Sequence, residues 1–122
     1  MSLLQSRPVH AAAGFAAMGG WAWFANRHHP APVPLIAGLV QGALTAVITL
    51  FLKAVIEAIF RRSAGWRRFA FPPLAACLTS VVLLGAVHTA AGTPAVLATI
   101  SVPVTVSTLY AALYTFVLSR HA

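Results

Sequence analysis

Residues 33–60 read VPLIAGLVQGALTAVITLFLKAVIEAIF, a run of apolar residues broken by few polar ones. An α-helix needs about 20 residues of this kind to cross the hydrocarbon core of a bilayer. The run is therefore long enough to cross with tilt, or to project into the interface. It predicts a transmembrane helix, and this helix decides the class of the protein.

The composition of the whole chain agrees with this class. Of its 122 residues, 60% are hydrophobic and 7% are charged, whereas soluble domains carry about 25% charged residues. A soluble domain is therefore excluded. The net charge of +7 does not indicate nucleic-acid binding, because the cations lie between apolar runs instead of gathering on a polar face. We predict a multi-pass protein of the inner membrane, with membrane lipids and no nucleic acid among its partners.

Four apolar runs follow one another along the chain, at 9–26, 33–60, 69–91 and 95–118. Proline or glycine separates consecutive runs, and the links are short, so neighbouring helices are expected to be antiparallel. The first run is the weakest, since it is short and contains Gly14, Gly19 and Gly20. We interpret it as a retained helix, because no small-x-small cleavage site ends it. The predicted fold is one all-α domain, a bundle of four transmembrane helices.

The cations predict the orientation of this bundle. With four crossings, one side of the membrane carries six arginines: Arg7, Arg61, Arg62, Arg67, Arg68 and Arg120. The other side carries Arg27 alone. Cytoplasmic loops are enriched in Lys and Arg, so both termini are predicted to be cytoplasmic.

A polar stripe runs along the second helix at steps of four residues. Its members are Gln41, Thr45, Thr49, Lys53 and Glu57, and Arg61 continues the row. A charge near the centre of a membrane helix costs about 2.5–3.5 kcal/mol, so the stripe is expected to face protein or water. One hypothesis makes the stripe the wall of a substrate path. The other makes Lys53 and Glu57 a structural pair, with Glu57 also in reach of Arg61.

Two functions are compatible with these features. The first is a small transporter or flippase in which the stripe lines the path and Arg61, Arg62, Arg67 and Arg68 bind anionic headgroups, which favours an anionic or lipid-linked substrate. The second is a non-catalytic accessory subunit of a larger membrane complex. Because four short helices enclose little volume, either function predicts a homo-oligomer or a partner membrane protein.

Small residues also predict close helix contacts. The second helix contains Gly38-x-x-x-Gly42, and the first has Ala12, Ala16 and Gly20 at the same spacing. The fourth helix carries a row of small and hydroxyl residues suited to packing or to a polar lumen, namely Ser101, Thr105, Thr108, Ala112, Thr115 and Ser119.

Signatures of catalysis and of metal binding are missing from the sequence. It has no paired carboxylates, no nucleophile beside a base and no phosphate-binding glycine loop, so we predict no enzyme and no cofactor. His28, His29 and His88 are expected on one side of the membrane, but no acid or thiol accompanies them, so no metal site is predicted. These histidines and His10 are interpreted as interfacial.

Overall fold

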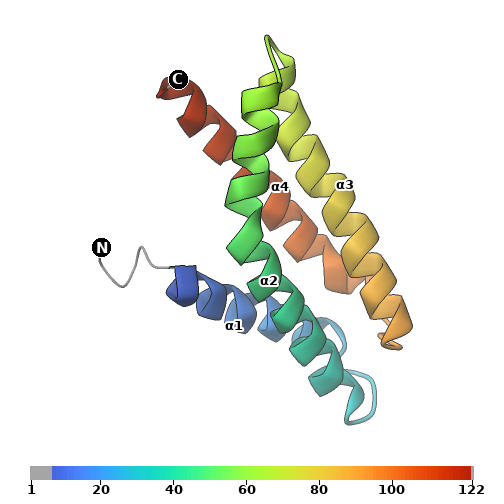
Figure 1. Cartoon of the computed structure of the whole chain (residues 1–122). Coiled ribbons are helices and arrows are strands. Elements are labelled where there is room, and N and C mark those ends of the chain that lie inside the picture. The colour runs from blue at the N-terminus through green and yellow to red at the C-terminus, as the bar shows by residue number, and fades with distance from the viewer. Residues whose placement is uncertain (1–6, 122) are drawn as a thin grey trace.

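The computed structural model describes residues 7–121 and contains four helices joined by short links (Figure 1). The helices are α1 (Arg7–Ala25), α2 (Val33–Arg62), α3 (Arg67–Ala90) and α4 (Val96–Arg120). Each end lies within two residues of the end predicted from the sequence. The described part of the chain is therefore all-helical, with its breaks where proline and glycine predict them.

Local chemistry accounts for these breaks. Three prolines between Pro30 and Pro34 keep the first link from continuing as helix, and Pro34 is accommodated in the first turn of α2. Gly65 has a φ of +63° between α2 and α3, and Gly92 has a φ of +76° between α3 and α4. Glycine adopts these left-handed conformations without a steric cost, which ends one helix and allows the next to begin.

The helices form two closely packed pairs. Helix α1 packs mainly on α2 and α3 mainly on α4, while α2 contacts all three other helices. In Figure 1, α3 and α4 run alongside α2, and α1 lies across the half of α2 that follows the first link. An apolar core of Ile56, Ala76 and Ala111 joins α2, α3 and α4.

Glycines bring α1 and α2 into backbone contact. A Cβ built on Gly19 would lie 2.8 Å from the carbonyl oxygen of Gly38, and one on Gly42 would lie 2.9 Å from the ring of Phe15. The predicted contact of Gly38-x-x-x-Gly42 is thus confirmed, with Gly19 as its partner. The row of Ala12, Ala16 and Gly20 is exposed, and nothing lies within 4 Å of the Cβ position of Gly20.

The outer surface is that of a membrane protein. Within the described residues, α2, α3 and α4 are each long and apolar enough to cross a membrane, whereas the shorter α1 is not among these candidates. Large apolar side chains face outward, with Leu97 82% exposed and Val82 69% exposed. The fold is therefore that of a helical multi-pass membrane protein, in which α2, α3 and α4 are the apolar spans and α1 is the shorter additional helix.

Candidate functional site

A partly enclosed cavity of about 290 Å³ lies among the helices, and α2 forms its polar wall. Ligand sites for small molecules begin at about 300 Å³, so this cavity is at the small end of that range. Gln41, Thr45, Thr49 and Lys53 all line it. Four of the five predicted path residues therefore share one cavity, and Glu57 is not among the residues that line it.

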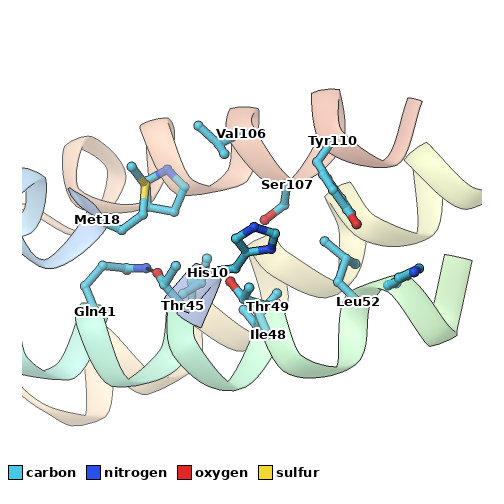
Figure 2. Close-up of a pocket in the computed structure, with 13 residues that line it drawn as sticks. His10, Met18, Gln41, Thr45, Ile48, Thr49, Leu52, Val106, Ser107 and Tyr110 are labelled. Carbon is cyan, nitrogen blue, oxygen red and sulfur yellow. Dashed lines mark hydrogen bonds between the residues drawn. The ribbon is translucent and has the colours of Figure 1, made fainter. Parts of the chain in front are cut away.

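The remaining walls come from all three other helices. They are formed by His10 and Met18 of α1, Leu84 of α3, and Pro103, Val106, Ser107 and Tyr110 of α4, while Ile48 and Leu52 of α2 add apolar surface beside the polar stripe. Figure 2 shows the His10 side chain projecting into the space between α2 and α4. The cavity therefore combines an apolar middle with polar groups from opposite sides.

Near the first link, hydrogen bonds join α1 to α4. There the indole Nε1–H of Trp21 donates to the carbonyl oxygen of Ala98 over 3.0 Å, and Asn26 hydrogen bonds to α4. Farther along, toward Lys53, cavity-lining side chains occupy the space between the two helices. We call the region of Asn26, His88, Thr93 and Thr99 the closed end, and the region of Lys53, Glu57, Arg61 and Tyr114 the open end.

At the closed end, Asn26 forms the N-terminal cap of α4 from another part of the chain. Its side chain is fully buried, its Oδ1 accepts the backbone N–H of Ala95 over 3.1 Å, and its Nδ2 donates to Oγ1 of Thr99 over 2.8 Å. A helix N-terminus leaves backbone N–H groups without partners, and a side-chain amide supplies one. Asn26 therefore fixes the end of α1 to the start of α4.

Four side chains between the closed end and the cavity form a chain of hydrogen bonds. The Nε2 of Gln41 donates to Oγ1 of Thr45, Oε1 of Gln41 is paired with Nε2 of His88, and Nδ1 of His88 is paired with Oγ1 of Thr93, each over 2.8 Å. Since the amide oxygen only accepts, Nε2 of His88 carries the hydrogen. Gln41 and His88 are both fully buried. The chain thus links the α3–α4 turn to the cavity wall.

At the open end, the predicted Lys53–Glu57 pair is not formed. Oε2 of Glu57 pairs with Nη2 of Arg61 at 3.3 Å, and Oε1 accepts the hydroxyl of Tyr114 over 2.6 Å. The Nζ of Lys53 lies 5.7 Å from the centre of the Tyr114 ring, and the residue is exposed. Glu57 therefore agrees with the structural hypothesis, because it is bonded to Arg61 and Tyr114. Lys53 agrees with the hypothesis of a substrate path, because it faces the cavity.

The four arginines predicted to bind headgroups flank the link between α2 and α3. Arg61, Arg62 and Arg67 are exposed, whereas Arg68 is half-buried with its guanidinium 4.5 Å from the centre of the Phe60 ring. All four lie beyond Lys53 on the open side of the molecule, outside the cavity. Of the three exposed arginines, Arg61 is paired with Glu57.

The histidines are arranged differently from the expectation of four interfacial side chains. His28 and His29 are exposed in the first link, but His88 is buried and His10 lines the cavity. Among residues 7–121 no cluster of metal-ligating side chains occurs.

Sequence reasoning missed His10, Ser107, Tyr110 and the buried Asn26. A signal for His88 was present, because Pro72, Ala76, Ser80, Leu84 and His88 recur every four residues and form the buried face of α3. The lining residues of α4, namely Pro103, Val106, Ser107 and Tyr110, also share one helix face, but they are mostly apolar and do not stand out in the sequence. Comparison with protein-family models, with curated proteins and with solved structures gives no match for this chain.

Proposed function

We propose that the chain is a small transporter or flippase of the inner membrane that carries an anionic or lipid-linked substrate. The observation that supports this proposal is the cavity into which Gln41, Thr45, Thr49 and Lys53 all face. A polar stripe sealed against other helices needs no cavity, whereas a path needs space beside its polar groups. Four helices cross the membrane in this proposal, including α1.

Both termini and the open end face the cytoplasm in this arrangement. The arginines at the ends of α2, α3 and α4 support it through their charge. From Val33 to Lys53 a helix rises about 30 Å, which is the thickness of the hydrocarbon core. Lys53 therefore lies where the core meets the headgroups. A cysteine added after the C-terminus should react with a membrane-impermeant maleimide only after cells are opened, and labelling of intact cells contradicts this orientation.

The charges around the cavity favour an anion. Lys53, the one lysine of the chain, lines the cavity. Glu57, the one acidic residue of the chain, is bonded to Arg61 and Tyr114. The cavity volume of about 290 Å³ suits a small organic anion or a lipid headgroup rather than an entire lipid. For a lipid substrate, the acyl chains remain in the bilayer while the headgroup enters.

Flux into vesicles tests the proposal with two probes. The soluble probe is benzenesulfonate, which stays ionised at all relevant pH values, and the lipid probe is a fluorescent phosphatidylglycerol. Lys53→Gln should lower the flux of the transported probe at least about tenfold, since it removes a charge interaction worth more than about 1.4 kcal/mol at the cavity mouth. Arg120→Gln is the matched control, because it removes one exposed positive charge that lies outside the cavity and outside the four arginines predicted to bind headgroups, and its flux should stay within about twofold.

The accessory-subunit alternative is favoured by the exposed row of Ala12, Ala16 and Gly20 on α1, which suits a second membrane helix. The same vesicles separate the two functions. If the wild-type protein, folded and correctly oriented, moves neither probe, the accessory role replaces the transporter. If Lys53→Gln carries its probe as fast as the wild type, the proposed path is wrong.

A further inference from the structure

His88 is a buried titratable group that the transport path does not itself require. It is 0% exposed, and both of its ring nitrogens have partners at 2.8 Å, namely Gln41 on α2 and Thr93 in the turn before α4. A residue whose only role was to hydrogen bond to these two partners could be one that does not titrate. Histidine is the side chain whose ordinary titration range lies near neutral pH.

The partners of His88 satisfy both of its protonation states without moving. In the neutral ring, Nε2–H donates to Oε1 of Gln41 and Nδ1 accepts the hydroxyl of Thr93. In the imidazolium, Nε2–H keeps its acceptor, and Nδ1–H donates to Oγ1 of Thr93 after the hydroxyl rotates. Because the amide of Gln41 and the hydroxyl of Thr93 remain bonded in both states, the site can gain and lose a proton within the same fold.

We propose that His88 binds a proton together with an anion in the neighbouring cavity, which makes the protein an anion–proton symporter. This inference rests on the proposed transport function and adds its coupling ion. His88 is connected to the cavity in two ways: its partner Gln41 lines the cavity, and so does Leu84, one turn earlier on α3.

The proton reaches His88 through Thr93. Thr93 is 7% exposed, and residues 89–92 beside it are exposed. In the state of the transport cycle in which the cavity opens on this side, water and the anion therefore both approach from here. A hydronium ion gives a proton to Oγ1 of Thr93 as the original hydroxyl proton passes to Nδ1 of His88. One O–H bond of hydronium and one of Thr93 break, one O–H and one N–H bond form, and the products are water and imidazolium. The net charge gained at His88 is one.

Charge balance explains why the proton and the anion bind together. The charged and titratable groups on the two helices packed against α3 are Lys53, Glu57, Arg61 and Arg62 on α2 and Tyr110, Tyr114 and Arg120 on α4, and His10 of α1 lines the neighbouring cavity. Lys53 lies about 18 Å along α2 from Gln41, and Glu57 is one turn farther. Glu57, the one acidic residue of the chain, is therefore too far along α2 to balance imidazolium, whereas an anion that has moved from Lys53 to the Gln41 end of the cavity is separated from His88 by one side chain. Opposite charges outside bulk water attract strongly, so each ligand raises the affinity of the other.

Nuclear magnetic resonance of histidine-labelled protein in lipid nanodiscs tests proton binding directly. The signal of His88 is assigned with His88→Gln and is followed from pH 8 to about pH 5, the range of histidine titration. We expect His88 to take up a proton in this range, and the midpoint to rise by about half a unit or more when benzenesulfonate is added. A ring that stays neutral throughout, or a midpoint that benzenesulfonate leaves unchanged, overturns the proposal.

Transport into vesicles gives the second test. One-to-one symport across a difference of one pH unit balances at an accumulation of about tenfold, because both gradients then have equal free energy. Wild-type protein should approach this accumulation of benzenesulfonate, and His88→Gln, which can still bond to Gln41, should reach about onefold. Thr93→Val keeps the imidazole and removes the proton donor, so it should slow the approach to the same endpoint. His29→Gln, an exposed histidine on the same side, is the control and should behave as the wild type.

The possible outcomes distinguish proton coupling at His88 from the proposed transport function on which it rests. Flux of benzenesulfonate that depends on Lys53 but ignores the pH gradient leaves the transporter in place and overturns the coupling. If fluorescent phosphatidylglycerol is the transported probe, the same comparison is made with its flipping rate at two outer pH values. Absence of flux for both probes overturns both proposals together.

Discussion

The two ends of the molecule hold their polar groups in opposite ways. At the closed end, Asn26, Gln41, His88 and Thr99 are each 0% exposed and bonded to other protein groups. At the open end, Lys53 and Arg61 are exposed, and Arg61 pairs with Glu57 at the surface. Buried polar groups are costly without partners, whereas exposed ones have water. The closed end should therefore determine stability, and the open end should determine what enters the cavity.

The largest expected effect lies at the glycine contact between α1 and α2. Gly19→Ala places a Cβ 2.8 Å from the carbonyl oxygen of Gly38, which is backbone and cannot rotate away. Overpacking usually costs about 1–3 kcal/mol, and we expect the upper end of this range or more. Thermal unfolding in detergent, followed by circular dichroism, measures the loss.

Gly20→Ala is the matched control for this change. Its Cβ meets nothing within 4 Å, and alanine is the better helix former by about 1 kcal/mol, so stability should be unchanged or slightly higher. Equal unfolding temperatures for the two variants would show that α1 does not pack on α2 through Gly19.

The next effect concerns the buried amide of Asn26. Asn26→Ala removes the acceptor for the N–H of Ala95 and a donor to Thr99, so we expect a loss of about 2 kcal/mol in the free energy of unfolding. Arg27→Ala removes an exposed bond to the carbonyl of Phe24 and an exposed cation–π contact with the Phe24 ring at 3.8 Å, and it should cost less than about 1 kcal/mol. Equal losses for the two variants would remove the distinction between buried and exposed polar groups on which the comparison rests.

The smallest effect is expected at Glu57. Glu57→Gln keeps an acceptor for the Tyr114 hydroxyl and loses the ion pair with Arg61, whose side chain is 73% exposed. Exposed ion pairs contribute about 0–1 kcal/mol, so the variant should unfold within about 1 kcal/mol of the wild type. Flux in vesicles should also change little, because Glu57 does not line the cavity. A large loss of stability would mean that Glu57 balances Lys53 after all.

The sequence predicted the helices well because their ends depend on local chemistry. Apolar runs, prolines just before α2 and in its first turn, and glycines at positions 65 and 92 act within a few residues. The polar stripe of α2 also follows from spacing along one helix. The role of α1 was harder to predict, since its contact with α2 depends on Gly19 meeting Gly38, and regular spacing instead drew attention to Ala12, Ala16 and Gly20.

The rest of the site depends on how the helices diverge, and the sequence pattern of one helix does not predict this divergence. His10 and Tyr110 line the cavity only because α1 and α4 separate beyond Trp21 and Ala98. The hydroxyl row of α4 is divided in the structure, since Thr115 is buried whereas Thr105 is not. Thr105 is exposed, and its hydroxyl bonds to the carbonyl of Ser101 in the same helix, so it needs no partner on another helix.

The backbone contact between Gly19 and Gly38 also has a consequence for biosynthesis. Of the four helices α1 leaves the ribosome first, yet within the described residues it is the helix that is not among the candidate spans, although it has 19 residues. Its complementary surface is made only when Gly38 and Gly42 follow. Insertion of α1 and α2 as a helical hairpin, in one event at the translocon, meets this requirement. Nascent chains stalled before residue 42 has left the ribosome should therefore hold α1 in the bilayer less firmly than longer ones.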